Sequence, residues 1–293
     1  MLRNQLLSKQ RKNGKINLET ILERGKQVRI LFVGDVMGKP GQEMLKQYLP
    51  LLKRKYQPQV TIVNGENATR GRGINEKVYK EILKAGADVL TMGNHTWDNP
   101  ELQTFIGRAP KLVRPANFSA NKVPGQGYTI IKVNQLKLGV VNLIGRVFMN
   151  PSDDPFAIGE ALITKLAKQV DAIFVDFHAE TTSEKEAFAW YFAGKVSAVV
   201  GTHTHVQTND ARILPGGTAY LTDVGFTGPY DGILGMKRTN VIERFLTQMP
   251  TRFEVDTESQ TTLGACLIEV DDASGKAKSI QTIQINPDHP WLD

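Results

Sequence analysis

Short apolar runs alternate with stretches of helical periodicity through the first third of the chain. The run 28–36, VRILFVGDV, is apolar and β-branched and predicts a buried strand, and the stretch 41–56 repeats its apolar residues at helical spacing. A strand at 60–67, a helix at 74–87 and a strand at 88–95 follow in the same order. This alternation predicts βαβ units and a largely parallel sheet.

Two residues set the expected ends of these helices. Pro50 lacks a backbone N–H, and we expect it to kink or end the helix 41–56. Gly86 adopts a left-handed conformation easily and is expected to close the helix 74–87.

The rest of the chain mixes hairpins with further strand–helix units. The segment 128–145 predicts a hairpin turning near Asn134 and Gln135, and 262–285 predicts a second one with its loop at Asp272–Lys276. Between them we expect strands at 171–180, 198–205 and 218–226 and helices at 157–170 and 183–195. The sequence therefore predicts an α/β fold with mixed sheets.

The bulk composition fits one large domain with a short extension. The chain has 293 residues, of which 41% are hydrophobic, and no Pro/Gly/Ser-rich linker divides it. We expect a single domain at 28–293, preceded by an extension at 1–27. The net charge is +6, and the extension supplies +5 of it. We favour a solvated extension over a contact with RNA or an anionic surface, which clustered Lys and Arg would also allow.

The cysteine count narrows the chemistry. Cys266 is the single cysteine, which excludes an internal disulfide and a cysteine-built metal site and fits a reducing compartment. Neither a membrane-spanning apolar run nor the apolar core of a signal peptide is found, so we expect a cytoplasmic protein.

Polar side chains follow five of the expected strands. They are Asp35, then Glu66 with Asn67, then Asn94 with His95, then His178, and finally His203 with His205. Ligands bind beyond the carboxyl ends of parallel strands, so these side chains should share one rim. Each alone is more often a turn former, a helix cap or a structural histidine. Together they use four of the five histidines, leaving only His289 in the tail, which we expect at the surface.

The residue types at this rim suit a metal centre. Carboxylate and amide oxygens mixed with imidazoles are typical ligands of first-row transition metals. Seven ligands are too many for one ion and suit two ions that share a carboxylate. His203 and His205 lie two residues apart, so on a strand both would face the same side, each toward a different ion.

The ordered motifs resemble a known family. GDVMG, NGEN, GNHTWD, FHAE and GTHTH look like the five blocks of the calcineurin-like metallophosphoesterases. The longer stretches ILFVGDVMGKPG, NGENATRGRGI and VGTHTHVQTND resemble its bacterial YmdB-like branch of cyclic-nucleotide phosphodiesterases. The resemblance covers residues 28 to about 290. Met37 stands where the superfamily usually has a histidine, and Glu66 where it usually has an aspartate; the narrower branch shows the same changes.

The resemblance implies a fold and a metal arrangement. The fold would be a four-layer α/β/β/α sandwich of two mixed sheets. One ion would be held by Asp35, Glu66, Asn67 and His205, and the other by Glu66, Asn94, His178 and His203, with Glu66 bridging. The family metal is often iron, and manganese can substitute for it.

A catalytic role follows for one further histidine. His95 comes directly after the expected ligand Asn94, and we assign it as the general acid of a phosphoester hydrolysis in which a water shared by the metals attacks phosphorus. Asp98 could orient His95, although a helix cap is the favoured role for it.

Substrate contacts are less sharply indicated. Arg70 and Arg72 follow the ligand Glu66 and could grip a phosphate, and solvated loop arginines are equally consistent. Loop residues that could contact a base or ribose are Asn117, Phe118, Phe226 and Tyr230, although packing inside the protein is the commoner role of such aromatic residues.

The leading hypothesis is a dinuclear metal phosphodiesterase that hydrolyses 2′,3′-cyclic mononucleotides to 3′-nucleotides, as the resemblance implies. A phosphomonoesterase or protein phosphatase could use the same metal core. A metal-dependent regulatory protein that binds RNA or a nucleotide is a third reading, supported by the basic extension and opposed by His95, because binding needs no general acid. RNA is the less favoured partner, and a homo-oligomer is expected from the frequency of such assemblies.

Overall fold

The computed structural model describes residues 27–118 and 123–292. The expected basic extension lies outside the described residues except for Gln27, which begins the first strand and pairs with Asp271. Within the described ranges no helix is both long and apolar enough to cross a membrane.

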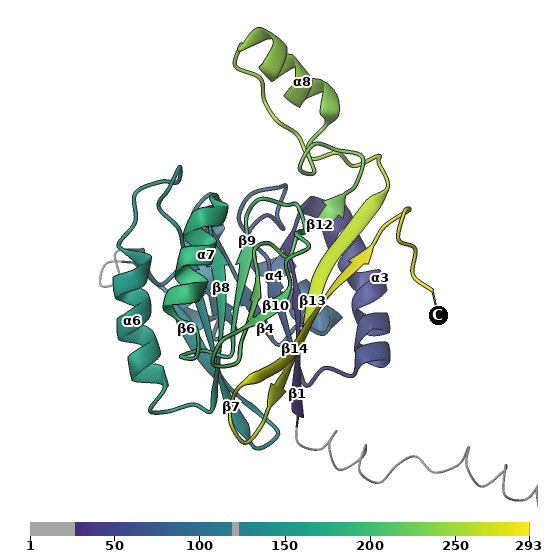
Figure 1. Cartoon of the computed structure of the whole chain (residues 1–293). Coiled ribbons are helices and arrows are strands. Elements are labelled where there is room, and N and C mark those ends of the chain that lie inside the picture. The colour runs from purple at the N-terminus through teal and green to yellow at the C-terminus, as the bar shows by residue number, and fades with distance from the viewer. Residues whose placement is uncertain (1–26, 119–122, 293) are drawn as a thin grey trace, which may run out of the picture.

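Two mixed sheets carry the fold (Figure 1). In the first, β1 (Gln27–Val33), β3 (Val60–Asn64), β4 (Val89–Thr91) and β5 (Leu112–Val113) run parallel. β13 (Thr261–Asp271) pairs antiparallel with β1 and joins β14 (Ala277–Ile285) and β12 (Phe226–Pro229), and β2 (Asp35–Val36) closes this edge.

The second sheet has the order β10-β11-β9-β8-β7-β6. β7 (Leu136–Ile144), β8 (Ala172–His178), β9 (Ala198–Thr202) and β11 (Thr218–Leu221) are parallel at its centre. β6 (Tyr128–Val133) and β10 (Arg212–Leu214) flank them as antiparallel edges.

Helices cover the outer face of each sheet, as Figure 1 shows. α3 (Gly38–Tyr56) and α4 (Glu76–Ala85) pack on the first sheet, near the short α5 (Glu101–Phe105) and the 3₁₀ turn η1 (Ile106–Arg108). α6 (Pro155–Leu166) and α7 (Thr182–Tyr191) pack on the second. The expected α/β/β/α sandwich of two mixed sheets is confirmed.

Three apolar cores separate the four layers. Leu31 and Val63 face α3 and α4 on one side of the first sheet, and Val175 faces α6 and α7 on the outer side of the second. Between the sheets, the rings of Phe32 and Phe174 meet edge to face with centroids 5.0 Å apart. Cys266 is fully buried in this middle core and is a free thiol. The central strands are buried on both faces, because alternate residues face the helices on one side and the other sheet on the other.

Several local predictions are confirmed. Gly86 closes α4 in the left-handed region with φ 120°, and the side chain of Asn75 caps its start by accepting from the Val78 amide. The turn of the first hairpin contains Asn134 at φ 56°, and the second hairpin turns over Asp272–Lys276.

One expectation about a helix end is wrong in part. α3 begins at Gly38 and continues through Pro50 to Tyr56. Pro50 is exposed, whereas its neighbours Leu49 and Leu52 are fully buried against the sheet. Packing of this apolar face outweighs the single hydrogen bond that proline removes, so the helix does not end there.

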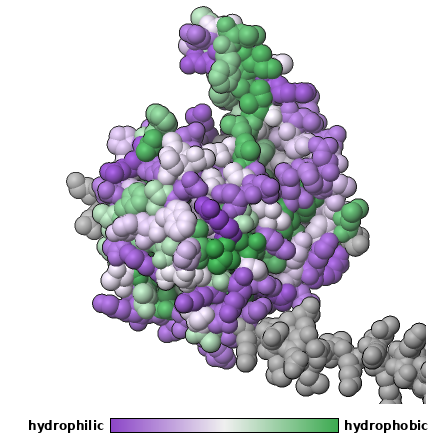
Figure 2. Space-filling model, viewed as in Figure 1, coloured by the Kyte–Doolittle hydropathy of each residue, from purple (hydrophilic) through white to green (hydrophobic). Residues whose placement is uncertain are grey.

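One segment stands away from the sandwich. Residues 231–260, which we call the arm, carry α8 (Arg238–Thr247) at the far end of a stalk (Figure 1). Within α8 only Val241 is buried. Figure 2 shows apolar surface gathered on this helix, where Phe245 and Leu246 are 78% and 79% exposed.

Candidate metal centre and active site

The strand ends of both sheets converge at one rim. Asp35 follows β1, Glu66 and Asn67 follow β3, and Asn94 and His95 follow β4 in the first sheet. His178 ends β8, and His203 and His205 follow β9 in the second. Hydrogen bonds across the rim show that the two sets meet: the His203 amide donates to Asp35 Oδ2 at 3.0 Å. The structure thus brings the sequence-predicted ligands together.

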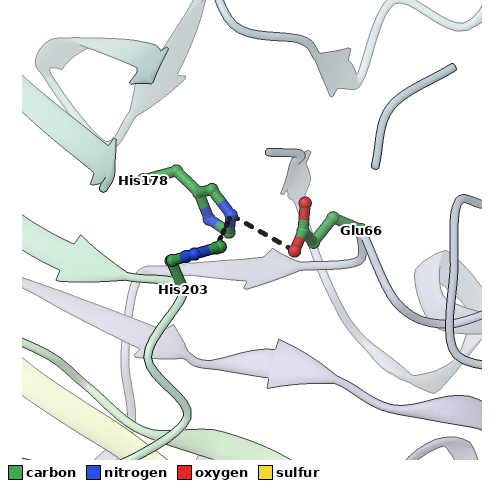
Figure 3. Close-up of side chains that lie close together, drawn as sticks. All are labelled: Glu66, His178 and His203. Carbon is green, nitrogen blue, oxygen red and sulfur yellow. Dashed lines mark hydrogen bonds and ion pairs between the residues drawn. The ribbon is translucent and has the colours of Figure 1, made fainter. Parts of the chain in front are cut away.

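One half of the rim is a compact cluster of three side chains. Ligand atoms of Glu66, His178 and His203 lie within 4.8 Å of one another (Figure 3). His178 Nε2 is 3.2 Å from Glu66 Oε1 and 3.0 Å from His203 Nδ1. The same nitrogen is 2.9 Å from Asn94 Oδ1. Four potential ligand atoms therefore surround one small volume, as a cation would require.

The other half is formed by Asp35, Asn67 and His205. His205 Nε2 lies 3.3 Å from Asp35 Oδ2, and Asn67 is 3% exposed beside Glu66. Asp35 Oδ1 and Asn67 Oδ1 are buried and have no hydrogen-bond partner among the described residues. Buried oxygens without a partner are costly, and a bound cation would satisfy both. The residues present thus fit a second metal ion.

The electrostatics of the cluster also suit a cation. Burial disfavours the carboxylate of Glu66, but the charge of His178 and its hydrogen bond outweigh burial and lower the pKa of Glu66 to about 2. Burial and the nearby charge of His178 lower the pKa of His203 to about 3. Glu66 is therefore ionised and His203 neutral at pH 7, the forms in which both ligate metals. Burial lowers the pKa of His178, but the charge of Glu66 outweighs burial and raises it to about 9, so His178 has to lose its proton to bind a metal.

A buried chain of hydrogen bonds holds His178 in place. Its Nδ1 lies 2.9 Å from Thr202 Oγ1, which donates to Asp176 Oδ1 at 2.6 Å. Asp176 Oδ2 accepts from Asn64 Nδ2 at 2.9 Å, and Asn64 Oδ1 accepts from the Glu66 amide at 3.0 Å. The chain links β3 with β8 and β9, so it fixes two ligands from different sheets with respect to each other.

The two neighbouring histidines do not lie on a strand, which corrects the expectation that β9 would carry both. β9 ends at Thr202, and His203 and His205 lie in the following bend with φ 99° and φ 62°. Asp223 Oδ2 fixes this bend by accepting from the Thr204 amide at 3.1 Å. Strained left-handed residues, held by tertiary contacts, thus aim the imidazoles at opposite halves of the rim.

A glycine leaves room for the cluster. A Cβ atom on Gly93 would overlap the Glu66 carboxylate and the His178 ring. The close approach of the backbone after β4 therefore requires glycine at this position.

His95 lies at the mouth of the site. Its amide donates to Glu66 Oε2 at 3.1 Å, and its ring Nδ1 is 2.8 Å from Asp98 Oδ2. The favoured expectation that Asp98 caps a helix is wrong, because α5 begins at Glu101 with Pro100 at its N-cap. Asp98 orients His95 instead.

Each of the loop residues expected to contact a base or ribose has a partner inside the protein. Asn117 is fully buried, and its side chain bonds Ile144 and Asp153, so it is not available to a ligand. The Tyr230 hydroxyl donates to Asp288 at 2.6 Å. Phe226 stacks on the His205 ring with centroids 5.0 Å apart and thus supports a ligand. The ring of Phe118 packs 6.0 Å from Trp97.

A cavity of about 930 Å³ opens over the rim and contains residues that sequence reasoning missed. Glu180, which lines it, bonds His203 Nε2 at 2.9 Å. Arg72 lines the same cavity, whereas Arg70 does not. The arm supplies Arg244 and Phe245 to its wall. Glu180 is the last residue of the FHAE motif, so the sequence contained a signal for its place in the site. No sequence signal indicated that the arm lies over the site.

Comparison with known proteins agrees with this geometry. Residues 31–283 match the family described as YmdB-like protein. The chain is 56% identical over 266 residues to a Bacillus subtilis protein named 2′,3′-cyclic-nucleotide 2′-phosphodiesterase, covering 91% of this chain and all of that protein.

Solved structures share the fold. A Mycoplasma pneumoniae structure described as a novel phosphatase superposes with a TM-score of 0.84 at 38% identity, over 90% of this chain and 96% of that one. A Staphylococcus aureus structure titled as a candidate 5′-nucleotidase superposes with a TM-score of 0.60 at 15% identity, over 91% of this chain and 55% of that one. The second likeness concerns the fold alone.

Proposed function

The chain belongs to the YmdB-like family, and from that premise we propose that it is a metal-dependent phosphodiesterase acting on 2′,3′-cyclic mononucleotides, which it opens to 3′-nucleotides. The observation that carries the proposal is the rim itself, where potential ligands from both sheets surround one small volume and two buried oxygens nearby have no hydrogen-bond partner among the described residues. The name of the 56% identical Bacillus subtilis relative supports the choice of substrate.

We propose two metal ions at the rim. One would be held by Asp35, Glu66, Asn67 and His205, and the other by Glu66, Asn94, His178 and His203. The resemblance to the metallophosphoesterases favours iron, with manganese as a substitute, and nitrogen and oxygen ligands without thiolate suit either metal. Cys266 lies in the core between the sheets and takes no part. When bound, such a pair neutralises phosphoryl oxygens and makes a water a better nucleophile.

The chain's own residues would then position and protonate the substrate. The cavity above the rim would hold the ribose and base, with Arg72 and Arg244 in its wall. His95 donates a proton to the 2′-oxygen as the P–O2′ bond breaks, while water adds to phosphorus and leaves a 3′-phosphate and a 2′-hydroxyl. Asp98 holds Nδ1 of His95, which leaves Nε2 for the transfer.

The first experiment is chromatography of 2′,3′-cyclic AMP after incubation with iron- or manganese-loaded protein. We expect 3′-AMP, and we expect none from the Glu66→Gln variant, because that change removes the charge of the bridging ligand. Formation of 2′-AMP would mean that the other ester bond breaks. No product from protein shown to contain two metals would overturn the cyclic-nucleotide assignment.

A phosphomonoesterase is the second candidate, since a structural relative from Mycoplasma pneumoniae is described as a phosphatase. The same assay with 3′-AMP as substrate separates the two, because a phosphomonoesterase would release inorganic phosphate from it. The His95–Asp98 pair at the mouth of the site argues for catalysis over a purely regulatory nucleotide-binding role.

Location and assembly complete the proposal. A single buried thiol fits the reducing cytoplasm, where we place the protein. A homo-oligomer is proposed on the frequency of such assemblies alone, and light scattering of the purified protein tests it.

A further inference from the structure

A second cavity adjoins the one over the metal ligands. It encloses about 1120 Å³ and shares Arg72, Met236, Arg244 and Phe253 with the first cavity. One wall is the loop after β3, and the opposite wall is the arm. Material bound at the metal ligands could therefore continue into this space without leaving the protein surface.

Arginines dominate the charge of the second cavity. Arg70, Arg72, Arg244 and Arg252 all line it. Across residues 27–118 and 123–292, none of these four forms an ion pair with a carboxylate, although Arg212 elsewhere pairs with Glu186 at 3.1 Å.

The two acidic residues that share the cavity are engaged. Asp98 bonds His95, and Glu101 accepts from the Glu76 amide at 3.1 Å. The cavity thus presents positive charge that the protein itself does not neutralise.

The arginine loop is a built structure tied to the metal ligands. Asn67 donates through Nδ2 to the Gly71 carbonyl at 3.0 Å, so the loop hangs from a proposed ligand. The Thr69 amide bonds the Gly73 carbonyl at 2.9 Å. Arg70 has φ 56°, and a Cβ on Gly71 would press against Val255 of the arm. These contacts therefore fix the backbone at Arg70 and Arg72 relative to the rim.

A mononucleotide does not account for these charges. A 2′,3′-cyclic mononucleotide carries one phosphate, and that phosphate must lie at the metal ligands. Arg70 and Arg252 line the second cavity and not the first, and Arg72 and Arg244 line both. Without carboxylate partners among the described residues, these guanidinium groups call for additional phosphates, which guanidinium binds well. Phe245 at the first cavity and Phe253 at the junction supply aromatic faces beside the arginines, the combination that single-stranded nucleic acids occupy.

We propose that the substrate extends into this cavity as an oligoribonucleotide whose 3′ end carries a 2′,3′-cyclic phosphate. This rests on the proposed function of the metal site. The cyclic end lies at the rim, and the upstream phosphates lie along the arginines. Water adds to the terminal phosphorus, the P–O2′ bond breaks and the product is an RNA with a 3′-phosphate and a 2′-hydroxyl. Cleavage of RNA by attack of a 2′-hydroxyl is the class of reaction that supplies such ends.

The test compares two substrates on the full-length, metal-loaded protein. One is 2′,3′-cyclic AMP, and the other is a tetra-adenylate ending in the same cyclic phosphate. We expect the tetranucleotide to have the higher kcat/KM at low salt. Three phosphate contacts predict that this kcat/KM falls about twentyfold between 50 and 200 mM KCl, with a much smaller fall for the mononucleotide.

Variants locate the effect in the cavity. The Arg70→Gln/Arg252→Gln double variant should lower the ratio of the two kcat/KM values and flatten the salt dependence of the tetranucleotide. Arg212→Gln removes an arginine that is already paired and should leave both unchanged. Equal kcat/KM for the two substrates, or an advantage that survives in the double variant, overturns the inference. If the unaltered protein does not hydrolyse 2′,3′-cyclic AMP at all, the proposed function is rejected instead.

Discussion

The metal rim and the arm face each other across the same cavity, yet they are built in opposite ways. At the rim, Glu66 and His178 are buried, and each lies at the end of a central strand. In the arm, α8 buries only Val241 and stands clear of the sandwich. The sheets therefore hold the rim residues in fixed positions. The arm, which has few buried contacts, contributes to the wall of the substrate cavity. The predictions below separate these roles.

The largest effect is expected at the mouth of the rim. His95→Ala should lower kcat about 10²–10⁴-fold, because it would remove the proposed proton donor. Metal content, measured by plasma emission spectrometry, should stay at two ions, because His95 is not a ligand. His289→Ala, in the C-terminal tail, is the matched control, and unchanged turnover in His95→Ala would remove His95 from the mechanism.

Crowding of the rim should cost nearly as much. In Gly93→Ala the new methyl group overlaps Glu66 and His178, so these ligands must move. Misplacement on this scale costs about 100-fold in turnover, and metal content should fall with it. Gly107→Ala is the control, since a Cβ there meets nothing within 4 Å. A Gly93→Ala protein with full metal content and turnover would mean that Glu66 and His178 can move aside without loss of function.

Removing a hydrogen bond behind the rim should have a smaller effect than changing the rim itself. Thr202→Val removes the hydroxyl that joins His178 to Asp176, and metal affinity should fall about 10–100-fold. Thr227→Val is a matched control, because the buried Thr227 hydroxyl has no hydrogen-bond partner among the described residues. Competition with a metal chelator measures both affinities, and equal values would show that the hydrogen-bond chain is dispensable.

A change in the arm should alter binding and spare chemistry. Phe245→Ala removes an aromatic wall of the cavity, and loss of about 1 kcal/mol of stacking would raise KM about fivefold with kcat retained. Leu246→Ala is the control, because Leu246 is equally exposed but does not line the cavity. A fall in kcat with unchanged KM would place the arm in the chemical step.

The smallest effect is expected outside both regions. Deleting residues 1–26 removes a net charge of +5 but no residue of the rim or the arm. The kcat/KM for the mononucleotide, followed by the same chromatography, should fall less than the roughly fivefold expected for Phe245→Ala. A collapse of activity would mean that the extension helps to form the site.

The same contrast explains what could be predicted from the sequence. Rim residues follow buried strands, and the parallel strands of one sheet end on the same side, so Glu66 and Asn94 of the first sheet could be predicted to lie together, as could His178 and His203 of the second. That the two sets meet depends on how the sheets stack, which only the family resemblance implied. Asp98 was misassigned because its role depends on where α5 begins. The bend that holds His203 and His205 could not be foreseen either, since it depends on a tertiary contact with Asp223, 19 residues after Thr204.

The arm was not predicted because it lacks the signals on which such predictions rest. Residues 231–260 contain one short helix, and no apolar face of it is buried against a sheet. Few hydrogen bonds join the arm to the site, such as the one between the Leu234 carbonyl and His205 Nδ1 at 3.2 Å. The periodicity of hydrophobic residues indicates which face of an element is buried, so it predicts little for a segment with few buried residues.

The lone thiol offers a way to watch the two sheets separate. Cys266 lies on β13 in the middle core, beside Phe32 of β1, and burial raises the pKa of its thiol. Only the thiolate reacts with alkylating reagents, so the native protein should resist them until the layers part. The rate at which this thiol is alkylated, measured by mass spectrometry, therefore reports how often the sandwich opens, and no engineered probe is needed.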